Sequence, residues 1–287
     1  MAAEESPISM IETIKKRTSI RSYKEEALAT DLKERIRSSF KEDRGPFGGR
    51  VRYELIVKDL AKKDSDLKLG TYGVIKGAAS FVVAVIQEGE HDLEDFGYVF
   101  EKFILNATAL GLGTCWLGGT YTKGEFSKAI AQKEQEILPC ITPLGYPAQK
   151  RSLVETAMRL AAGSKTRKPW REIFFKEDFE QPLSEDEARE YATPLEMVRL
   201  APSASNKQPW RIVRDQGQFH FYLQHTKGYG KMLGFDIQRV DLGIAMCHFE
   251  LAAQELGLKG QWVVEHSRLH NVNLKLPEDT NYIVSWV

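Results

Sequence analysis

The sequence repeats itself at a spacing of 146 residues, and this repeat restricts the possible folds more than any other feature. When the chain is shifted by 146 positions, residues 95–116 align with residues 241–262 without a gap. Composition alone gives roughly one or two identities in such a window. The alignment has many more, and they include Asp95/Asp241, Gly97/Gly243, Phe103/Phe249, Ala107/Ala253, Leu110/Leu256, Gly111/Gly257, Leu112/Leu258 and Trp116/Trp262. The sequence therefore predicts two related halves, residues 1–175 and 176–287.

Composition excludes several classes of protein. The chain has 287 residues, of which 42% are hydrophobic and 28% charged, and this is enough for one large domain or for two smaller ones with packed cores. Lys and Arg balance Asp and Glu at 40 each, so no overall field attracts nucleic acid or anionic lipid. The longest apolar run, Ala78 to Ile86, is too short to span a bilayer, and the acidic N-terminus does not resemble a signal peptide. We expect a cytoplasmic protein that binds neither nucleic acid nor membrane.

The cysteines and histidines show no pattern of a metal site. Cys115, Cys140 and Cys247 lack Cys-x-x-Cys and zinc-type spacing, and the six histidines form no metal-binding pair. We expect reduced, mainly buried thiols and no bound metal.

Hydrophobic periodicity predicts helices over residues 30–40 and 95–110 and strands over residues 52–58 and 78–87. Gly111-x-Gly113 resembles part of a dinucleotide-binding fingerprint. It closes a helix instead of following a strand, however, and it lacks a third glycine, so we exclude that function.

Two helix starts are predicted from capping residues. Ser6 and Pro7 are typical of an N-cap followed by proline at the first helical position. In the second half, Thr193, Pro194 and Glu196 predict a complete capping box.

The segment from Ala201 to Trp210 lies between a predicted helix and a predicted strand. Pro202 and Pro209 favour a long, extended and stiff loop. Its uncharged donors and acceptors suit the edge of a flat heterocycle, although an ordinary helix-to-strand connection has a similar composition. These side chains are Ser203, Ser205, Asn206 and Gln208.

A basic segment follows the N-terminal helix. If it is extended, Arg17, Ser19 and Arg21 point to one side and form a small anion pocket, in which arginine makes paired hydrogen bonds to phosphate. The alternative is a solvated helix end whose cations complement the helix dipole.

Two further segments are candidates for ligand contact. Gly118 and Gly119 would let a planar ligand lie against the backbone, or they form a simple turn. The stretch from Lys165 to Trp170, which includes Arg167, either completes a phosphate site or is an exposed linker between the halves.

The loop and the basic segment together resemble a known family. Ala-Pro-Ser-Ala-Ser-Asn-Lys-Gln-Pro-Trp is similar to the Ala-Pro-Ser-x-x-Asn-x-Gln-Pro-Trp loop of nitroreductase-like flavoproteins, and Arg17-x-Ser19-x-Arg21 is similar to their phosphate arm. The resemblance implies an α+β fold, in which helices wrap mainly antiparallel strands and two pseudo-symmetric halves form a dimer within one chain. It also implies FMN as cofactor, bound by Arg17, Thr18, Ser19, Arg21, Gly118, Gly119, Lys165, Arg167, Pro202, Ser203, Ser205, Asn206 and Gln208.

Each half lacks what the other keeps. Residues 40–47 stand where the second half has its Ser-Asn-Gln loop, and the second half has no Arg-x-Ser-x-Arg segment. The pattern resembles a fused, single-chain branch of the family that keeps one composite site, so we expect a monomer that acts as a pseudo-dimer.

The resemblance further implies an oxidoreductase that passes hydride from NAD(P)H through flavin N5 to a nitroaromatic or quinone-like small molecule. No catalytic side chain is expected, because the flavin carries the chemistry. A flavin-binding protein without turnover, and another FMN reaction of the same family, stay open as alternatives.

Overall fold

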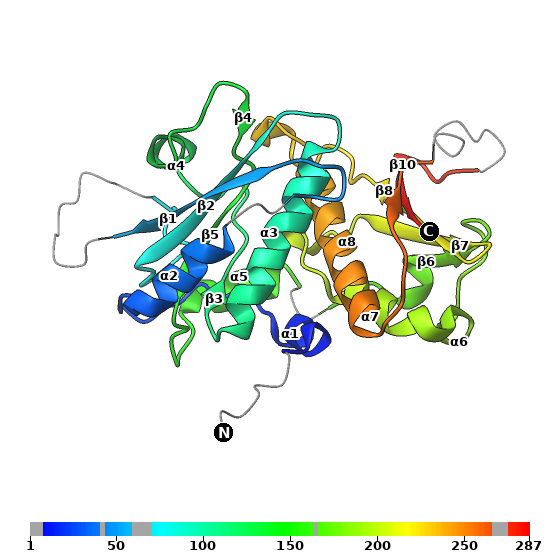
Figure 1. Ribbon diagram of the computed structural model, residues 1–287, viewed down its shortest axis with the longest axis horizontal. Helices are drawn as coiled ribbons and strands as arrows, with labels where there is room; N and C mark the ends of the chain where they lie inside the picture. Colours follow the sequence, from blue (N-terminus) through cyan, green and yellow to red (C-terminus); the bar gives the residue numbers. More distant parts are fainter. Residues whose placement is uncertain (1–7, 41–43, 59–69, 164–165, 266–274) are drawn as a thin grey trace.

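The computed structural model describes residues 8–40, 44–58, 70–163, 166–265 and 275–287. Two long helices, α3 (Asp92–Ala109) and α8 (Ile237–Glu255), run side by side through the centre, and a β-sheet lies on each side of the pair (Figure 1). The predicted α+β architecture is confirmed. The ends of the four predicted helices and strands differ from the observed ones by at most three residues.

The first sheet has the strand order β1-β2-β5-β3, with β4 paired to β2, and all of these pairs are antiparallel. Strand β2 is buried at every residue but its last, as its continuous apolar run predicts. The strands are β1 (Val51–Val57), β2 (Ser80–Gln87), β3 (Gly113–Thr114), β4 (Glu136–Ile137) and β5 (Ile141–Gly145).

The second sheet repeats this order as β7-β8-β10-β9, again with antiparallel pairs. A further strand, β6 (Phe174–Lys176), pairs in parallel with β7. It crosses the predicted boundary at residue 175, and the division into residues 1–175 and 176–287 stays a prediction. The other strands are β7 (Trp210–Asp215), β8 (Gln218–Gln224), β9 (Trp262–Val263) and β10 (Thr280–Trp286).

The central helices meet through a symmetric glycine contact. A Cβ atom on Gly97 would lie 2.1 Å from the carbonyl oxygen of Val240, and one on Gly243 would lie 2.0 Å from that of Glu94. Gly97 and Gly243 are partners in the repeat, and so are Glu94 and Val240. The two helices therefore use the same surface on each other, as the subunits of a twofold dimer do, and the predicted intrachain pseudo-dimer is confirmed.

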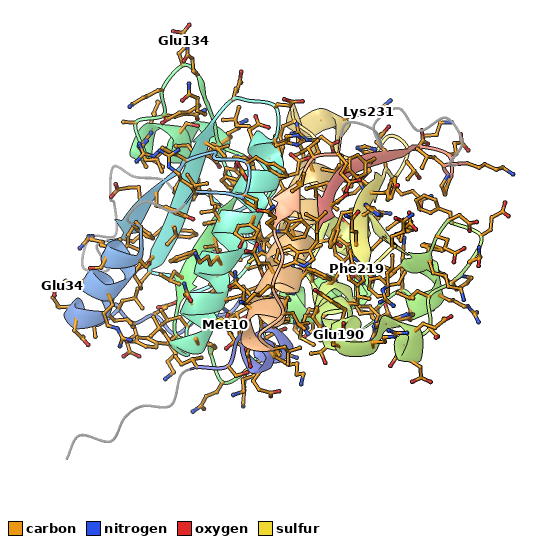
Figure 2. The ribbon with its side chains drawn as sticks, turned by 45° about the vertical axis from the view of Figure 1, so that its right-hand side comes forward. Met10, Glu34, Glu134, Glu190, Phe219 and Lys231 are labelled. Atoms are coloured by element: carbon orange, nitrogen blue, oxygen red, sulfur yellow. The ribbon has the colours of Figure 1, made fainter. Side chains whose placement is uncertain are left out.

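Shorter helices surround this centre. Helix α1 packs against α3, α7 and α8. One hydrophobic core extends through both halves, and side chains such as Phe219 fill the space between α8 and the second sheet (Figure 2). The helices are α1 (Met10–Lys16), α2 (Thr30–Ser39), α4 (Lys123–Ala129), α5 (Leu153–Ala161), α6 (Glu185–Ala188) and α7 (Ala192–Leu200). Short 3-10 turns span Trp170–Glu172, Arg189–Tyr191, Ala204–Asn206 and Lys231–Leu233.

Neither of the two predicted N-cap residues caps a helix among the described residues. The cap of α1 is Ser9, whose Oγ accepts a hydrogen bond from the Glu12 N–H at 3.1 Å, while Ser6 and Pro7 lie outside the described residues. The capping box at Thr193 is wrong, because the turn Arg189–Tyr191 leads directly into α7 and Thr193 lies inside the helix. A complete capping box occurs instead at Ser184, ahead of α6.

No helix within the described ranges is long and apolar enough to cross a membrane. Cys115, Cys140 and Cys247 are buried and form no disulfide, as predicted.

Candidate functional site

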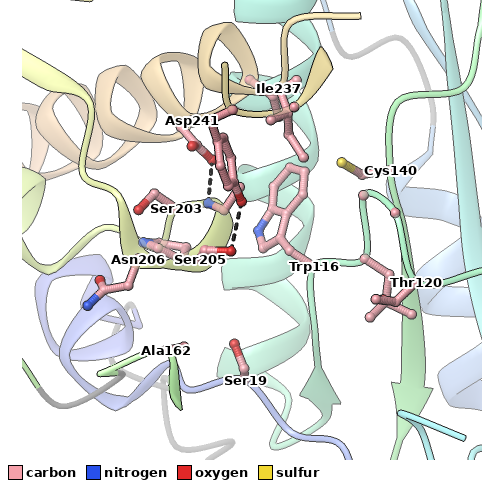
Figure 3. A pocket seen from close by; sticks show the side chains of 18 of the residues that line it. Ser19, Trp116, Thr120, Cys140, Ala162, Ser203, Ser205, Asn206, Ile237 and Asp241 are labelled. Atoms are coloured by element: carbon pink, nitrogen blue, oxygen red, sulfur yellow. Dashed lines mark hydrogen bonds between the residues drawn. The ribbon is translucent and has the colours of Figure 1, made fainter. Parts of the chain in front are cut away.

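A cavity of about 620 Å³ lies between the halves and is lined by residues of both (Figure 3). Ser203, Ser205 and Asn206 lie on one side of it, and Trp116 and Thr120 lie on the other. Among the residues predicted to bind FMN, those that line the cavity are Arg17, Thr18, Ser19, Arg21, Gly118, Gly119, Arg167, Pro202, Ser203, Ser205 and Asn206. Gln208 is not among the lining residues, and Lys165 falls outside the described part of the chain.

The basic segment leaves α1 and runs along the edge of the first sheet. Ser19 forms a β-bridge with Thr114, and the Ile20 N–H donates to the Thr114 carbonyl oxygen at 2.8 Å. This pairing keeps the segment extended and presents its arginines to the cavity. The Nε atoms of Arg17 and Arg21 are buried and have no hydrogen-bond partner among the described residues.

Sequence reasoning missed a further arginine at this end of the cavity. Arg159 lies on α5, and its Nη1 donates to Thr18 Oγ1 at 3.0 Å and to the Ser19 carbonyl oxygen at 3.3 Å. Its pKa is lowered by burial and by the neighbouring Arg151, Arg21 and Arg17, while the Glu155 carboxylate opposes this effect. The amphipathic pattern of residues 153–161 could have predicted the helix, but no motif marks Arg159 as a ligand contact.

Arg167 approaches the cavity from the segment that follows α5. Its Nη1 donates to Asn206 Oδ1 at 3.2 Å, and its Nη2 donates to the Leu200 carbonyl oxygen at 3.1 Å. Burial, with a smaller effect from Arg17, lowers the pKa of Arg167 to about 10. Four arginines thus line one cavity, and an anion between them would offset their repulsion.

The loop after α7 is less extended than predicted. Ser203 is extended, but Ala204–Asn206 form a 3-10 turn. Ser205, Asn206 and Gln208 have φ angles of 46°, 56° and 49°, in the left-handed region that residues other than glycine rarely adopt. Such clusters of strained residues are typical of functional loops. Ala201, before Pro202, is extended as expected, whereas Gln208, before Pro209, has a positive φ. Its N–H donates to Ser203 Oγ and its side chain accepts from the Lys168 N–H, and these hydrogen bonds hold it in that conformation.

The polar side chains of Ser205, Asn206 and Gln208 form hydrogen bonds with other residues of the protein. The Asn206 amide donates to the carbonyl oxygens of Gly163 and Thr166, and Gln208 Oε1 accepts from the Lys168 N–H at 2.8 Å. Ser205 Oγ accepts from the Tyr229 hydroxyl at 2.8 Å. Asn206 and Gln208 therefore tie the loop of the second half to the end of the first half.

The two glycines lie where the halves approach each other. A Cβ atom on Gly118 would lie 2.4 Å from Ile237 Cδ1, and one on Gly119 would lie 3.0 Å from Leu233 Cδ2. A side chain at position 118 would therefore displace the end of the Ile237 side chain on α8.

A buried network supports the wall of the cavity. Glu101, on α3, accepts hydrogen bonds from Trp116 Nε1 at 2.7 Å and from His248 Nε2 at 2.9 Å, the latter with His248 as donor. Arg17 Nε lies 3.9 Å from the same carboxylate. The network connects the basic segment, the cavity wall and both central helices. Its residues are far apart in sequence, so spacing could not reveal it.

A second cavity, of about 870 Å³, lies at the start of α3. Its lining residues fall between Phe40 and Glu136, so all of them belong to the first half. Arg44, Arg50, Arg52 and Lys133 are among its lining residues, but of the residues that the structure describes, none from the second half and none from residues 17–21 lines it.

Comparison with known proteins supports one family. A family model described as "Putative TM nitroreductase" matches residues 9–253. Comparison with curated proteins gave no match. A solved "putative nitroreductase" from Thermotoga maritima covers 99% of this chain and 95% of its own, with 21% identity and a TM-score of 0.60.

Shorter proteins align with about half of the chain. Nitroreductases with bound FMN from Desulfitobacterium hafniense and Bacteroides fragilis are each 20% identical, with TM-scores of 0.39. Each covers 51% of this chain and more than 90% of its own. The family model, in contrast, extends over both halves, and the Thermotoga maritima structure shares the fold over nearly the whole length. The chain therefore belongs to the nitroreductase family, with both halves of the fold in one polypeptide.

Proposed function

We propose that the protein is an FMN-dependent oxidoreductase that transfers hydride from NAD(P)H to a nitroaromatic or quinone-like acceptor. The observation that carries the proposal is the composite cavity, whose lining includes four arginines and which has an uncharged polar loop along one side. The buried Nε of Arg21, which has no hydrogen-bond partner among the described residues, fits a phosphate group, because a buried donor without a partner is costly unless a ligand satisfies it. Arg17 Nε likewise has no hydrogen bond there, although it lies 3.9 Å from the Glu101 carboxylate.

Different residues of the cavity would contact the phosphate and the ring of FMN. Arg17, Arg21 and Arg159 would hold the phosphate, with Thr18, Ser19 and Arg167 beside them, and a contact from Lys165 stays a prediction from the sequence. The hydroxyls of Ser203 and Ser205, beside Pro202, would face the ring edge, while Asn206 and Gln208 would keep the loop in place. Gly118 and Gly119 would line the ring through their backbone. FMN would supply a carrier that accepts and releases two electrons.

The proposal is tested by stopped-flow mixing of the flavin-loaded protein with NADH and with NADPH. We expect the flavin absorption band to bleach with at least one of them and to return when a nitroaromatic or quinone is added. A coloured protein that neither nicotinamide bleaches would favour a flavin carrier without turnover, and a protein that binds no flavin would reject the whole proposal.

We further propose that one chain binds one FMN. Of these two cavities, as the described residues line them, the one between the halves combines a phosphate arm from one half with a loop from the other, and the one at α3 is built from the first half. The cavity at α3 has cations of its own, Arg44, Arg50, Arg52 and Lys133, but among the described residues no polar loop of the second half lines it to contact the edge of the flavin ring. Titration of the flavin-free protein should end at one equivalent per chain, and Arg17→Ala and Asn206→Ala should weaken that same event. An end point at two equivalents would contradict the prediction.

We also propose an oligomeric state and a cellular compartment for the protein. Because the interface that a nitroreductase dimer would need lies within the chain, we propose that a monomer is active. Cys115 and Cys140 are buried free thiols, and they support a reducing compartment such as the cytoplasm.

A further inference from the structure

Asp241 has a carboxylate oxygen that the fold leaves without a partner. The residue lies in the second turn of α8, lines the cavity and is only 2% exposed. Its Oδ1 accepts a hydrogen bond from the Ala204 N–H at 2.9 Å and so fastens the polar loop to α8 (Figure 3). Its Oδ2 is buried and has no hydrogen-bond partner in the described part of the chain.

The repeat supplies an internal comparison. Asp95 is the partner of Asp241 in the repeat and also fastens a loop, but it uses both oxygens. Its Oδ1 accepts from the Phe47 N–H at 2.9 Å, and its Oδ2 accepts from the Gly49 N–H at 2.6 Å. Fastening a loop therefore does not require an unpaired oxygen at this position. The half that keeps the composite site is the half whose aspartate retains a free oxygen.

The surroundings of Asp241 favour its neutral form. Burial raises its pKa well above the ordinary value, and the charge of Asp236 adds to this effect, while the hydrogen bond from Ala204 opposes it. The nearby Cys140 and Tyr229 also titrate with raised pKa values, mainly because of burial. No cation is among the groups that act on Asp241 in the described residues, so nothing there compensates a negative charge.

We propose that Asp241 is a protonated carboxyl group that binds the ligand of the cavity by donating a hydrogen bond from Oδ2. The ligand must then present an uncharged acceptor, such as a carbonyl oxygen or an unprotonated ring nitrogen. We take this ligand to be the flavin, and in that respect the inference rests on the proposed function. The protonation of Asp241 itself does not depend on the flavin, so the two can be tested separately.

The protonation state is tested on the flavin-free protein. A group with a raised folded-state pKa stabilises the fold fully below its unfolded pKa, and this contribution is lost as pH rises through the folded pKa. Asp241→Asn removes the titration and still offers an oxygen to the Ala204 N–H. The melting temperature of this variant minus that of the wild type should therefore rise with pH above about pH 4. A difference that is constant or falls with pH would show that Asp241 is ionised in the fold, and the proposal would fail.

The hydrogen bond is tested with riboflavin, which lacks the titrating phosphate. Wild-type affinity should fall roughly three- to tenfold as Asp241 ionises, because the donor is lost. Asp241→Asn keeps an N–H donor and should bind with an affinity that does not change with pH. Asp95→Asn is the matched control and should keep the wild-type profile.

The outcomes separate the two proposals. The wild type could bind riboflavin with the same affinity below and above the pH at which Asp241 ionises, as Asp241→Asn is expected to do. That result would reject the hydrogen bond. Failure of both riboflavin and FMN to bind would reject the proposed function, while the stability profile would still decide whether Asp241 is protonated.

Discussion

Gly97→Ala is expected to lower the stability of the fold by about 3 kcal/mol or more, and Gly243→Ala should do the same. The added Cβ atom would lie 2.1 Å or 2.0 Å from a carbonyl oxygen of the opposite helix, far inside normal contact. A backbone oxygen cannot rotate away, so α3 and α8 must separate. The loss should appear as a fall of roughly 6 °C or more in melting temperature.

Gly124→Ala is the matched control for these substitutions. Gly124 also lies in a helix, α4, but nothing lies within 4 Å of the position where a Cβ atom would be added. Alanine is the better helix former, so this variant should be neutral or slightly more stable. If Gly97→Ala were as stable as Gly124→Ala, the halves would not depend on the close helix contact, and the pseudo-dimer interface would need another explanation.

The repeat predicted the centre of the fold because the packing of two related helices constrains both sequences at once. Gly97 and Gly243 are identical in the two halves because each accommodates a carbonyl oxygen of the other helix. Asp95 and Asp241 are identical because each accepts a hydrogen bond that fastens a loop. Continuous burial in β2 was equally visible in the sequence. These features follow from the apolar pattern of a single segment or from one contact between two similar segments. They can therefore be predicted from the sequence.

Other features depend on contacts between distant segments, and the sequence could not show them. Arg159 reaches the cavity only because α5 packs beside the basic segment, and Glu101 meets His248 only across the central helices. The motif predicted which loop faces the cavity, but it did not predict that Asn206 and Gln208 would bond to residues 163–168. A motif marks positions, whereas the partners of each side chain depend on the tertiary fold.

The difference between the two halves has a physical interpretation. In the first half, Gly45 and Gly49 pack directly on Asp95, and the loop takes both of its oxygens. In the second half, the loop leaves one oxygen of Asp241 without a hydrogen-bond partner among the described residues, and Ser205 bonds to Tyr229. Both loops line a cavity, so the two halves differ in whether the loop engages one or both oxygens of its aspartate.

Arg21→Ala should weaken FMN binding by roughly 1.5 to 3 kcal/mol, which is about ten- to a hundredfold in the dissociation constant. The Nε of Arg21 is buried beside the cavity without a hydrogen-bond partner in the described residues. A phosphate with close to two negative charges would satisfy it with a charge-assisted hydrogen bond. The measurement is a fluorescence titration of the flavin-free protein with FMN.

Riboflavin is the matched ligand, because it has the same ring but no phosphate for Arg21 to bind. Its affinity should hardly change in Arg21→Ala, and Arg35→Ala, which removes an exposed arginine on α2, should leave both ligands unaffected. An equal loss for FMN and riboflavin would mean that Arg21 acts by holding the extended segment in place. The phosphate contacts would then have to come from Arg17 and Arg159, whose side chains line the same cavity.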